Sequence, residues 1–135
     1  MLGEMFGEDQ GKVTGIRVLP AEGQEPQVEV SFQASGQIFG VAYTEMATYR
    51  ATLKPGGFMR GLGQGILTTA DGELVTWTGE GVGKPKGTGS AASWRGSVFY
   101  QTSSQRLAKL NGICGVFEHE VDETGNAKSK VYEWK

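Results

Sequence analysis

The sequence predicts an all-β protein, an eight-stranded antiparallel up-and-down barrel with one short helix near residues 103–111. Three observations predict this fold. Apolar and polar residues alternate with a period of two over several segments, which is the period of a strand. Tight turn signals such as Ala70-Asp71-Gly72 separate these segments. Glycine makes up 22 of 135 residues but is interleaved with β-branched and aromatic residues, which is typical of bent, closely packed strands.

The N-terminal region has the weakest pattern. We expect residues 1–10 to form a flexible N-terminal arm and residues 11–135 to form a single β-barrel domain. Within that domain, Lys12–Leu19 is the first predicted strand, and a loop follows it through Pro26. The division rests on the lack of a strand period in the first ten residues.

The next two predicted strands form a hairpin. Apolar and polar residues alternate over residues 28–34, and Ser35-Gly36 supplies a two-residue turn. This turn pairs Phe32 with Phe39, so that the apolar faces of the two strands coincide. The later strand runs to about Leu53 with its odd-numbered residues facing inward.

Two triplets of glycine identify the hairpin around which the barrel is organised. Both have the spacing of a strand, so each occupies one face of its strand: Gly61, Gly63, Gly65 and Gly79, Gly81, Gly83. Turns at residues 54–57 and 70–72 set Tyr49 opposite Gly63, and Gly63 opposite Gly79. We therefore expect a strip of bare backbone to face the barrel axis, with aromatic rings covering it.

The C-terminal region predicts three more strands and the only helix. A strand is expected from about Ala91 to Thr102, and the helix near residues 103–111 follows it. Residues 113–134 form the last hairpin, whose register places Glu120 opposite Lys128 on the solvent side. Eight strands joined in this way can close into a barrel that holds one small ligand, and closure leaves no exposed edge strand.

The charge and composition exclude several partners. The formal net charge is −2, with both signs mixed along the chain, so there is no basic patch for nucleic acid and no basic helix for a membrane surface. No apolar stretch is long enough to span a membrane, and the N-terminus lacks the pattern of a signal peptide. The single cysteine, Cys114, suits a reducing compartment. We expect a cytoplasmic protein without nucleic-acid or membrane partners.

Several segments of the chain, taken together, have a familiar pattern: GLGQGIL, TADGELVTWTGEGVG, SWRGSVFYQT and VFEHEVDETGN with a terminal VYEW. From about Val13 onward the chain resembles a small, functionally uncharacterised bacterial family of calycin-like β-barrels, similar in fold to the barrels of allene oxide cyclases and dirigent proteins. The resemblance implies an oligomeric barrel whose interior could take an apolar molecule. No catalytic motif of the cyclases can be placed on this chain, so their activity does not transfer.

Most cofactor and metal chemistry is excluded by the residues present. One histidine and one cysteine are too few for a zinc site with nitrogen and sulfur ligands. The run that ends at Lys84 resembles a phosphate-binding loop, but Thr78 replaces its first glycine and Pro85 its Ser/Thr. Residues 87–92 resemble a dinucleotide fingerprint without the strand-to-helix unit that it needs. We expect no metal and no cofactor.

The inward-facing aromatic and polar side chains form the candidate site. Aromatic residues are expected to line a ligand-binding cavity: Tyr43, Tyr49, Trp77, Trp94, Tyr100 and Phe117. No residue is a firm catalytic candidate, but Glu45, His119 and Glu133 are weak ones, since an inward carboxyl or imidazole can move a proton. In the ordinary alternative, these three lie at a solvated rim, and the tryptophans only fill the space above the glycines.

Apolar residues also gather on the predicted outer face of three adjacent strands. The set comprises Ile38, Ala42, Met46, Leu62, Ile66, Leu74 and Val82. A contiguous exposed apolar surface marks an interface, so we expect a homo-oligomer that associates through these outer faces.

Three functions fit these features. The first is a non-enzymatic barrel that binds a small hydrophobic or aromatic molecule in its interior. The second is a cofactor-free cyclase or isomerase of the allene oxide cyclase type, in which Glu45, His119 or Glu133 moves a proton. The third is a purely structural oligomeric barrel with a filled core. Only the second function requires an ionisable group deep in the interior.

Overall fold

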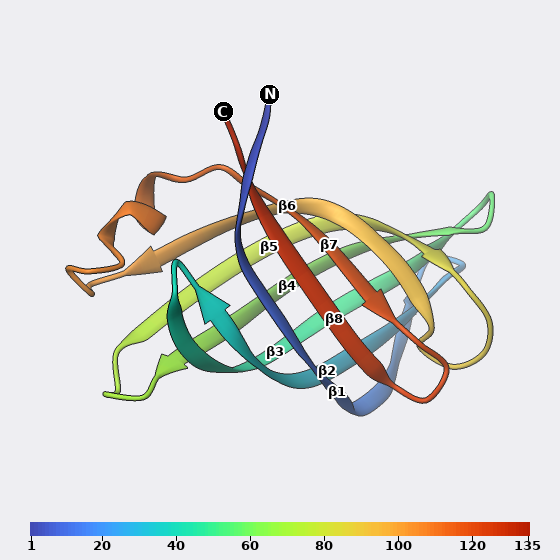
Figure 1. Ribbon diagram of the computed structural model, residues 1–135. Coiled ribbons are helices and arrows are strands. Elements are labelled where there is room, and N and C mark those ends of the chain that lie inside the picture. The colour runs from blue at the N-terminus through green and yellow to red at the C-terminus, as the bar shows by residue number, and fades with distance from the viewer.

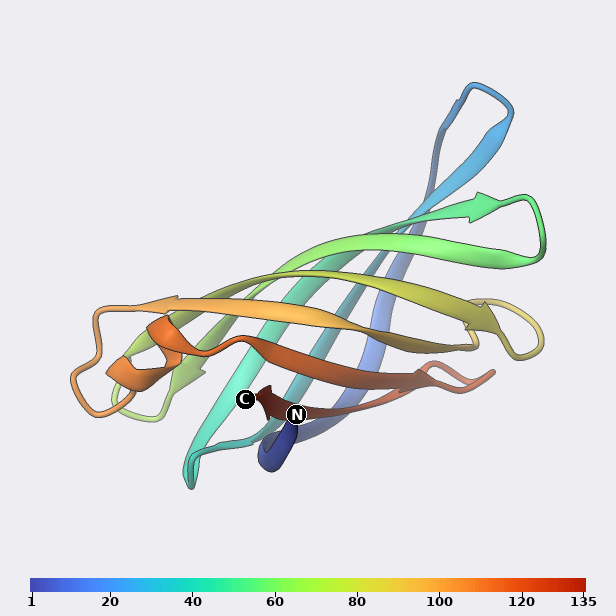
Figure 2. The same ribbon diagram turned by 90° about the horizontal axis from the view of Figure 1, so that it is seen from above.

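The computed structural model describes residues Met1–Lys135 and confirms the all-β prediction. Eight antiparallel strands follow one another in chain order and close into a barrel, because β1 pairs with both β2 and β8 (Figures 1 and 2). The strands are β1 (Leu2–Glu22), β2 (Glu25–Ile38), β3 (Val41–Lys54), β4 (Phe58–Thr69), β5 (Leu74–Pro85), β6 (Ala92–Thr102), β7 (Gly115–Val121) and β8 (Asn126–Trp134). The two termini lie side by side (Figure 1).

Strand β1 begins much earlier than the sequence predicts. Residues 2–10 belong to β1 instead of a flexible arm, and this part of β1 pairs with β8. The arm prediction is wrong because the pairing with β8 has two irregularities before Gly7, and these hide the period of two. The correction matters for function, since it places Asp9 on the wall of the barrel.

The β2–β3 hairpin turns later than predicted, at residues 39–40 instead of 35–36. Phe39 and Gly40 both have positive φ, 47° and 77°, which fits a type I′ hairpin turn. Phe32 therefore pairs with Ala47 rather than Phe39. The shift is even, so the inward face of each strand is unchanged. Ile38, however, now belongs to β2, where even-numbered residues face inward; it is 2% exposed, and its assignment to an outer interface is wrong.

The register of β3, β4 and β5 is as predicted. Tyr49 lies opposite Gly63, and Gly63 lies opposite Gly79. Trp77 lies opposite Gly65, as the turn at Asp71-Gly72 requires. The strip of glycines therefore faces the barrel interior, beneath large aromatic side chains.

The segment between β6 and β7 closes one end of the barrel. Its helix is a short 3₁₀ helix, η1 (Ala108–Gly112), shorter than the predicted 103–111. Ser104 Oγ accepts the Leu107 N–H at 3.3 Å, and Leu107 and Leu110 are completely buried in the barrel core. No helix of the structure is long and apolar enough to cross a membrane.

The final hairpin also has the predicted register, with Glu120 opposite Lys128. The ion pairs of Glu120 are nevertheless made with other partners, Lys86 and Arg95. Cross-strand neighbours therefore predicted the register without predicting the salt bridges.

Candidate functional site

A cavity of about 90 Å³ lies inside the barrel. It borders two clusters of buried side chains, an aliphatic one closed by η1 and an aromatic one that includes Phe32, Tyr49 and Trp94. Trp77 packs against both clusters. The cavity therefore lies where two packed cores meet.

The tryptophan rings lie flat against the glycine strip. A Cβ atom at Gly65 would overlap Trp77 Nε1, and one at Gly61 would lie 2.6 Å from the Trp94 ring. Glycine is therefore required at these positions for the rings to approach the wall. Gly63 and Gly79, in the middle of the strip, line the cavity. The tryptophans thus fill the space above the ends of the strip, and a void remains beside its centre.

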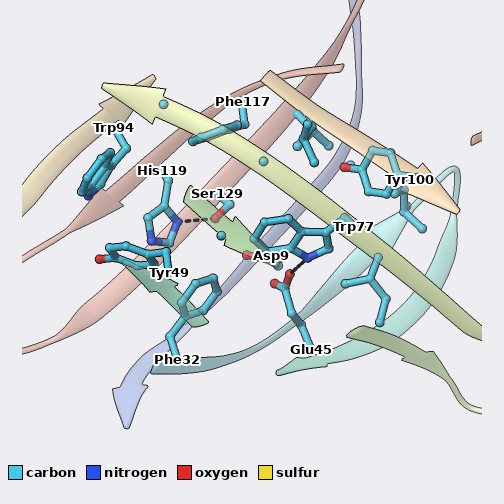
Figure 3. A pocket seen from close by; sticks show the side chains of 18 of the residues that line it. Asp9, Phe32, Glu45, Tyr49, Trp77, Trp94, Tyr100, Phe117, His119 and Ser129 are labelled. Carbon is cyan, nitrogen blue, oxygen red and sulfur yellow. Dashed lines mark hydrogen bonds between the residues drawn. The ribbon is translucent and has the colours of Figure 1, made fainter. Parts of the chain in front are cut away.

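Four side chains on one side of the cavity form what we call the acid cluster: Asp9, Tyr43, Glu45 and Trp77. Trp77 Nε1–H donates to Glu45 Oε2 at 2.7 Å (Figure 3). The Tyr43 hydroxyl donates to Asp9 Oδ2 at 2.7 Å. Burial, the charge of Asp9 and a hydrogen bond with Asp9 together raise the pKa of Glu45 to about 9, although the Trp77 N–H acts in the opposite direction. Glu45 is therefore protonated at neutral pH.

A second group, the histidine cluster, comprises Phe32, Tyr49, Trp94, His119 and Ser129 (Figure 3). The His119 and Phe32 ring centroids are 4.9 Å apart, and Tyr49 meets Trp94 edge-on at 5.3 Å. His119 Nδ1 is hydrogen-bonded to Ser129 Oγ at 2.6 Å. His119 Nε2 and Trp94 Nε1 are buried without a partner. Burial lowers the pKa of His119 to about 4, so the imidazole is neutral at neutral pH.

Tyr100 and Phe117 complete the wall between the clusters. The Tyr100 hydroxyl points into the cavity (Figure 3). Burial, and to a lesser extent the charges of Glu45 and Asp9, raise the pKa of Tyr100 above its usual value, so its hydroxyl remains a donor. No group of three or more His, Cys, Asp or Glu side chains lies close enough together to hold a metal ion.

The structure brings together most of the residues that the sequence singled out. All six predicted wall residues line the cavity: Tyr43, Tyr49, Trp77, Trp94, Tyr100 and Phe117. Glu45 and His119 also line it, and each is 6% exposed, so the solvated-rim interpretation is wrong for both. Glu133 lies opposite Gly115, outside the cavity lining. That these residues bind a ligand stays a prediction.

Sequence reasoning missed Asp9, because it lies in the segment expected to form an arm. A signal was present in Gly7, Asp9 and Gly11, which have the same spacing of two as the glycine strip. Ser129 was not assigned to the site either, since a lone serine has no distinguishing pattern.

No family model and no curated protein sequence matches this chain. Solved structures do match it. A protein of unknown function from Clostridium acetobutylicum ATCC 824 is similar with a TM-score of 0.83 at 10% identity, over 98% of each chain. A β-barrel-like protein from Acinetobacter baumannii AYE has a TM-score of 0.82 at 11% identity, over 100% of this chain and 96% of that chain. An enzyme from Penicillium herquei has a TM-score of 0.69 at 13% identity, over 96% and 92%.

At such low identities these similarities show the fold alone. The chain has a barrel fold found in bacterial proteins of unknown function. The barrel implied by the sequence resemblance is thereby confirmed, whereas the calycin-like relationship and the likeness to allene oxide cyclases stay predictions.

Proposed function

We propose that the protein binds a small, compact hydrophobic or aromatic molecule in the interior of the barrel. The proposal rests on the cavity of about 90 Å³, which is bordered by aromatic rings and by the bare backbone of Gly63 and Gly79. Protein interiors pack as densely as organic crystals, so atoms around a void lack dispersion contacts. A ligand of the right shape would restore those contacts.

The volume of the cavity limits the size of the ligand. An apolar protein cavity of about 150 Å³ takes up benzene, and this cavity is smaller. The ligand therefore has only a few non-hydrogen atoms unless the surrounding rings move. A long-chain lipid does not fit.

Thermal unfolding in the presence of a ligand panel tests this proposal. We expect pyrrole and other molecules smaller than benzene to raise the unfolding midpoint by several degrees, because a ligand at a hundred times its Kd stabilises the native state by about 2.7 kcal/mol. Val131→Phe, which fills the cavity, should abolish the shift. Val18→Phe, at a position on β1 that is 80% exposed, is the matched control and should keep it. No shift with any small ligand, and no change in tryptophan fluorescence, would contradict the proposal.

A second candidate function is cofactor-free proton transfer, as in a cyclase or isomerase. It is favoured by Glu45, since a carboxyl group whose pKa is about 9 can donate a proton near neutral pH. His119, whose pKa is about 4, would act only as an acceptor. One protein of similar fold, from Penicillium herquei, is an enzyme. A turnover that is lost in Glu45→Gln and kept in Glu133→Gln would favour this function over simple binding.

A third candidate is a structural homo-oligomer, favoured by the outer face of β3–β5. Met46, Leu62, Ile66, Leu74 and Val82 are between 40% and 58% exposed there, and Ala42 is exposed beside them. We propose that this face joins copies of the chain. Light scattering that finds only monomers at micromolar concentration would overturn the interface. Oligomers without any ligand binding would favour the structural role.

A further inference from the structure

The ionisable groups around the cavity are acidic or neutral. Four acidic residues line it, the exposed Glu8 and Glu80 and the more buried Asp9 and Glu45, and no lysine or arginine does. The one histidine of the wall, His119, is buried and neutral. An anionic ligand would therefore meet repulsion with no compensating positive charge.

The rest of the wall is rich in aromatic faces. Trp77 belongs to the acid cluster, and Tyr100 and Phe117 line the same cavity. The face of an aromatic ring attracts a cation, more strongly where water is excluded. Carboxyl groups next to aromatic rings form a surface that favours positive charge.

Two buried polar atoms of the wall lack a partner in the protein, His119 Nε2 and Trp94 Nε1. His119 Nε2 is buried with no hydrogen bond; it is an acceptor in the tautomer whose Nδ1–H donates to Ser129. The Tyr100 hydroxyl points into the cavity (Figure 3). A buried polar atom without a partner costs free energy, so His119 Nε2 marks a place that a ligand could satisfy, and the Tyr100 hydroxyl offers a second polar contact.

We propose that the ligand is a small organic cation, an alkylammonium ion. Its ammonium group lies against Asp9 and Glu45, and its alkyl body lies against Trp77, Tyr100 and Phe117. This inference rests on the proposed function, because it names the chemical class of ligand for the same cavity.

Binding exchanges the proton on Glu45 for the positive charge of the ammonium ion. In the free protein, one proton on Glu45 allows two carboxyl groups to lie side by side in an apolar environment. When the ammonium ion enters, Glu45 releases this proton to solvent, and the ammonium N–H groups donate to both carboxylates. The net charge of the interior does not change. No covalent bond between protein and ligand forms or breaks.

This exchange makes the affinity depend on pH. Cation binding is coupled to the loss of roughly one proton, so affinity rises by up to about tenfold per pH unit below the pKa of Glu45. It falls again when the ammonium ion loses its own proton, near pH 10.4 if it titrates as a lysine does. Over this range Tyr43 and Tyr100 stay protonated and His119 stays neutral, because burial disfavours the charged form of each. The carboxyl groups that remain are Asp9 and Glu45 in the interior and the exposed Glu8 and Glu80, of which Glu80 pairs with Arg60.

Calorimetric titration with isopropylammonium and with 2-propanol tests the inference. The two probes have the same number of non-hydrogen atoms and differ in charge. Between pH 6 and pH 9 we expect isopropylammonium to bind more tightly as pH rises, with release of roughly one proton, measured in buffers of different ionisation heat. The neutral alcohol should bind at least about tenfold more weakly, because it lacks the charge-assisted hydrogen bonds, and without a pH dependence.

Glu45→Gln is the decisive variant, because glutamine still accepts the Trp77 hydrogen bond but has no charge. It should weaken isopropylammonium binding by at least about tenfold and abolish both the pH dependence and the proton release. Glu4→Gln, which removes the same charge from an exposed position, should change neither. The pH profile and proton release of the wild-type protein test the inference without any variant.

Equal affinity for the alcohol and the ammonium ion, or an ammonium affinity that does not change with pH, would overturn the cation inference. Neither result would contradict the proposed function. Failure of both probes and of the whole neutral panel would overturn both. The two failures are therefore distinguishable.

Discussion

The acid cluster and the histidine cluster share one cavity, but the pKa of the buried acid is raised whereas the pKa of the buried histidine is lowered. Burial keeps Glu45 protonated well above its usual range and keeps His119 unprotonated well below its own. Burial is the largest cause of both shifts, because an apolar interior disfavours the charged form of either group. The clusters differ in pairing. The two carboxyl groups of the acid cluster have hydrogen-bond donors, whereas the histidine cluster leaves His119 Nε2 and Trp94 Nε1 without partners. The interior thus disfavours an isolated charge, but the carboxyl groups of the acid cluster have hydrogen-bond donors that can stabilise a negative charge.

The largest expected effect is the alkaline loss of stability caused by Glu45. Its pKa is raised on folding from 4.5 to about 9, so the native state binds more protons than the unfolded state between these values. The stabilisation is complete below pH 4.5 and is lost as pH rises towards 9, by several kcal/mol at most, on the order expected from linkage. Glu45→Gln should therefore become more stable relative to wild type as pH rises. Urea unfolding of both proteins at pH 5, 7 and 9 measures this, and parallel pH curves would argue against the raised pKa of Glu45.

The next largest effect is expected for Trp77→Phe. This change removes the donor to Glu45 and opens a space above Gly65, so we expect a loss of roughly 2–4 kcal/mol in the free energy of unfolding. Trp134→Phe is the matched control, because Trp134 is 55% exposed, and it should change stability by no more than about 0.5 kcal/mol. Similar losses in the two variants would show that the Trp77 hydrogen bond adds little.

The histidine cluster should give a smaller effect with the opposite sign. Folding lowers the pKa of His119 from 6.5 to about 4, so stability is present above pH 6.5 and is lost as pH falls towards 4. The expected loss is about 3 kcal/mol at most. His119→Gln keeps a side chain that can form a hydrogen bond with Ser129. It should reduce the loss of stability at acidic pH and leave the loss at alkaline pH unchanged. An NMR titration that finds an ordinary pKa for His119 would contradict the proposed difference between the two clusters.

The sequence predicts those parts of the fold in which a local signal determines the register. The glycine strip is the best case, because the turns that flank β4 have conventional residues and fix which glycines face each other. The β2–β3 turn was missed because Phe39, a bulky residue, rarely adopts positive φ, whereas Ser35-Gly36 has the usual turn composition. The error left the inward faces intact, since a shift by an even number of residues preserves them.

The candidate site was only partly predictable, because alternation shows which way a side chain points but not how deep it lies. His119 is buried by Phe32, Tyr49 and Trp94, which come from three other strands. Asp9 was overlooked because it lies in the segment that was expected to form an arm. One of the causes of the raised pKa of Glu45 was therefore overlooked as well. Pairing of β1 with β2 sets Asp9 opposite Gly36, which lies opposite Tyr43 on β3, so the acid cluster depends on the segment that was expected to form an arm.

A crystal structure of the protein under xenon pressure tests the central claim most directly, because xenon enters apolar cavities. We predict one interior xenon site beside Gly63 and Gly79, in contact with Tyr100 and Phe117, and no change in the surrounding strands. An interior without xenon, in which the ring of Trp77 or Phe117 occupies that space, would contradict the claim that the barrel has room for a ligand.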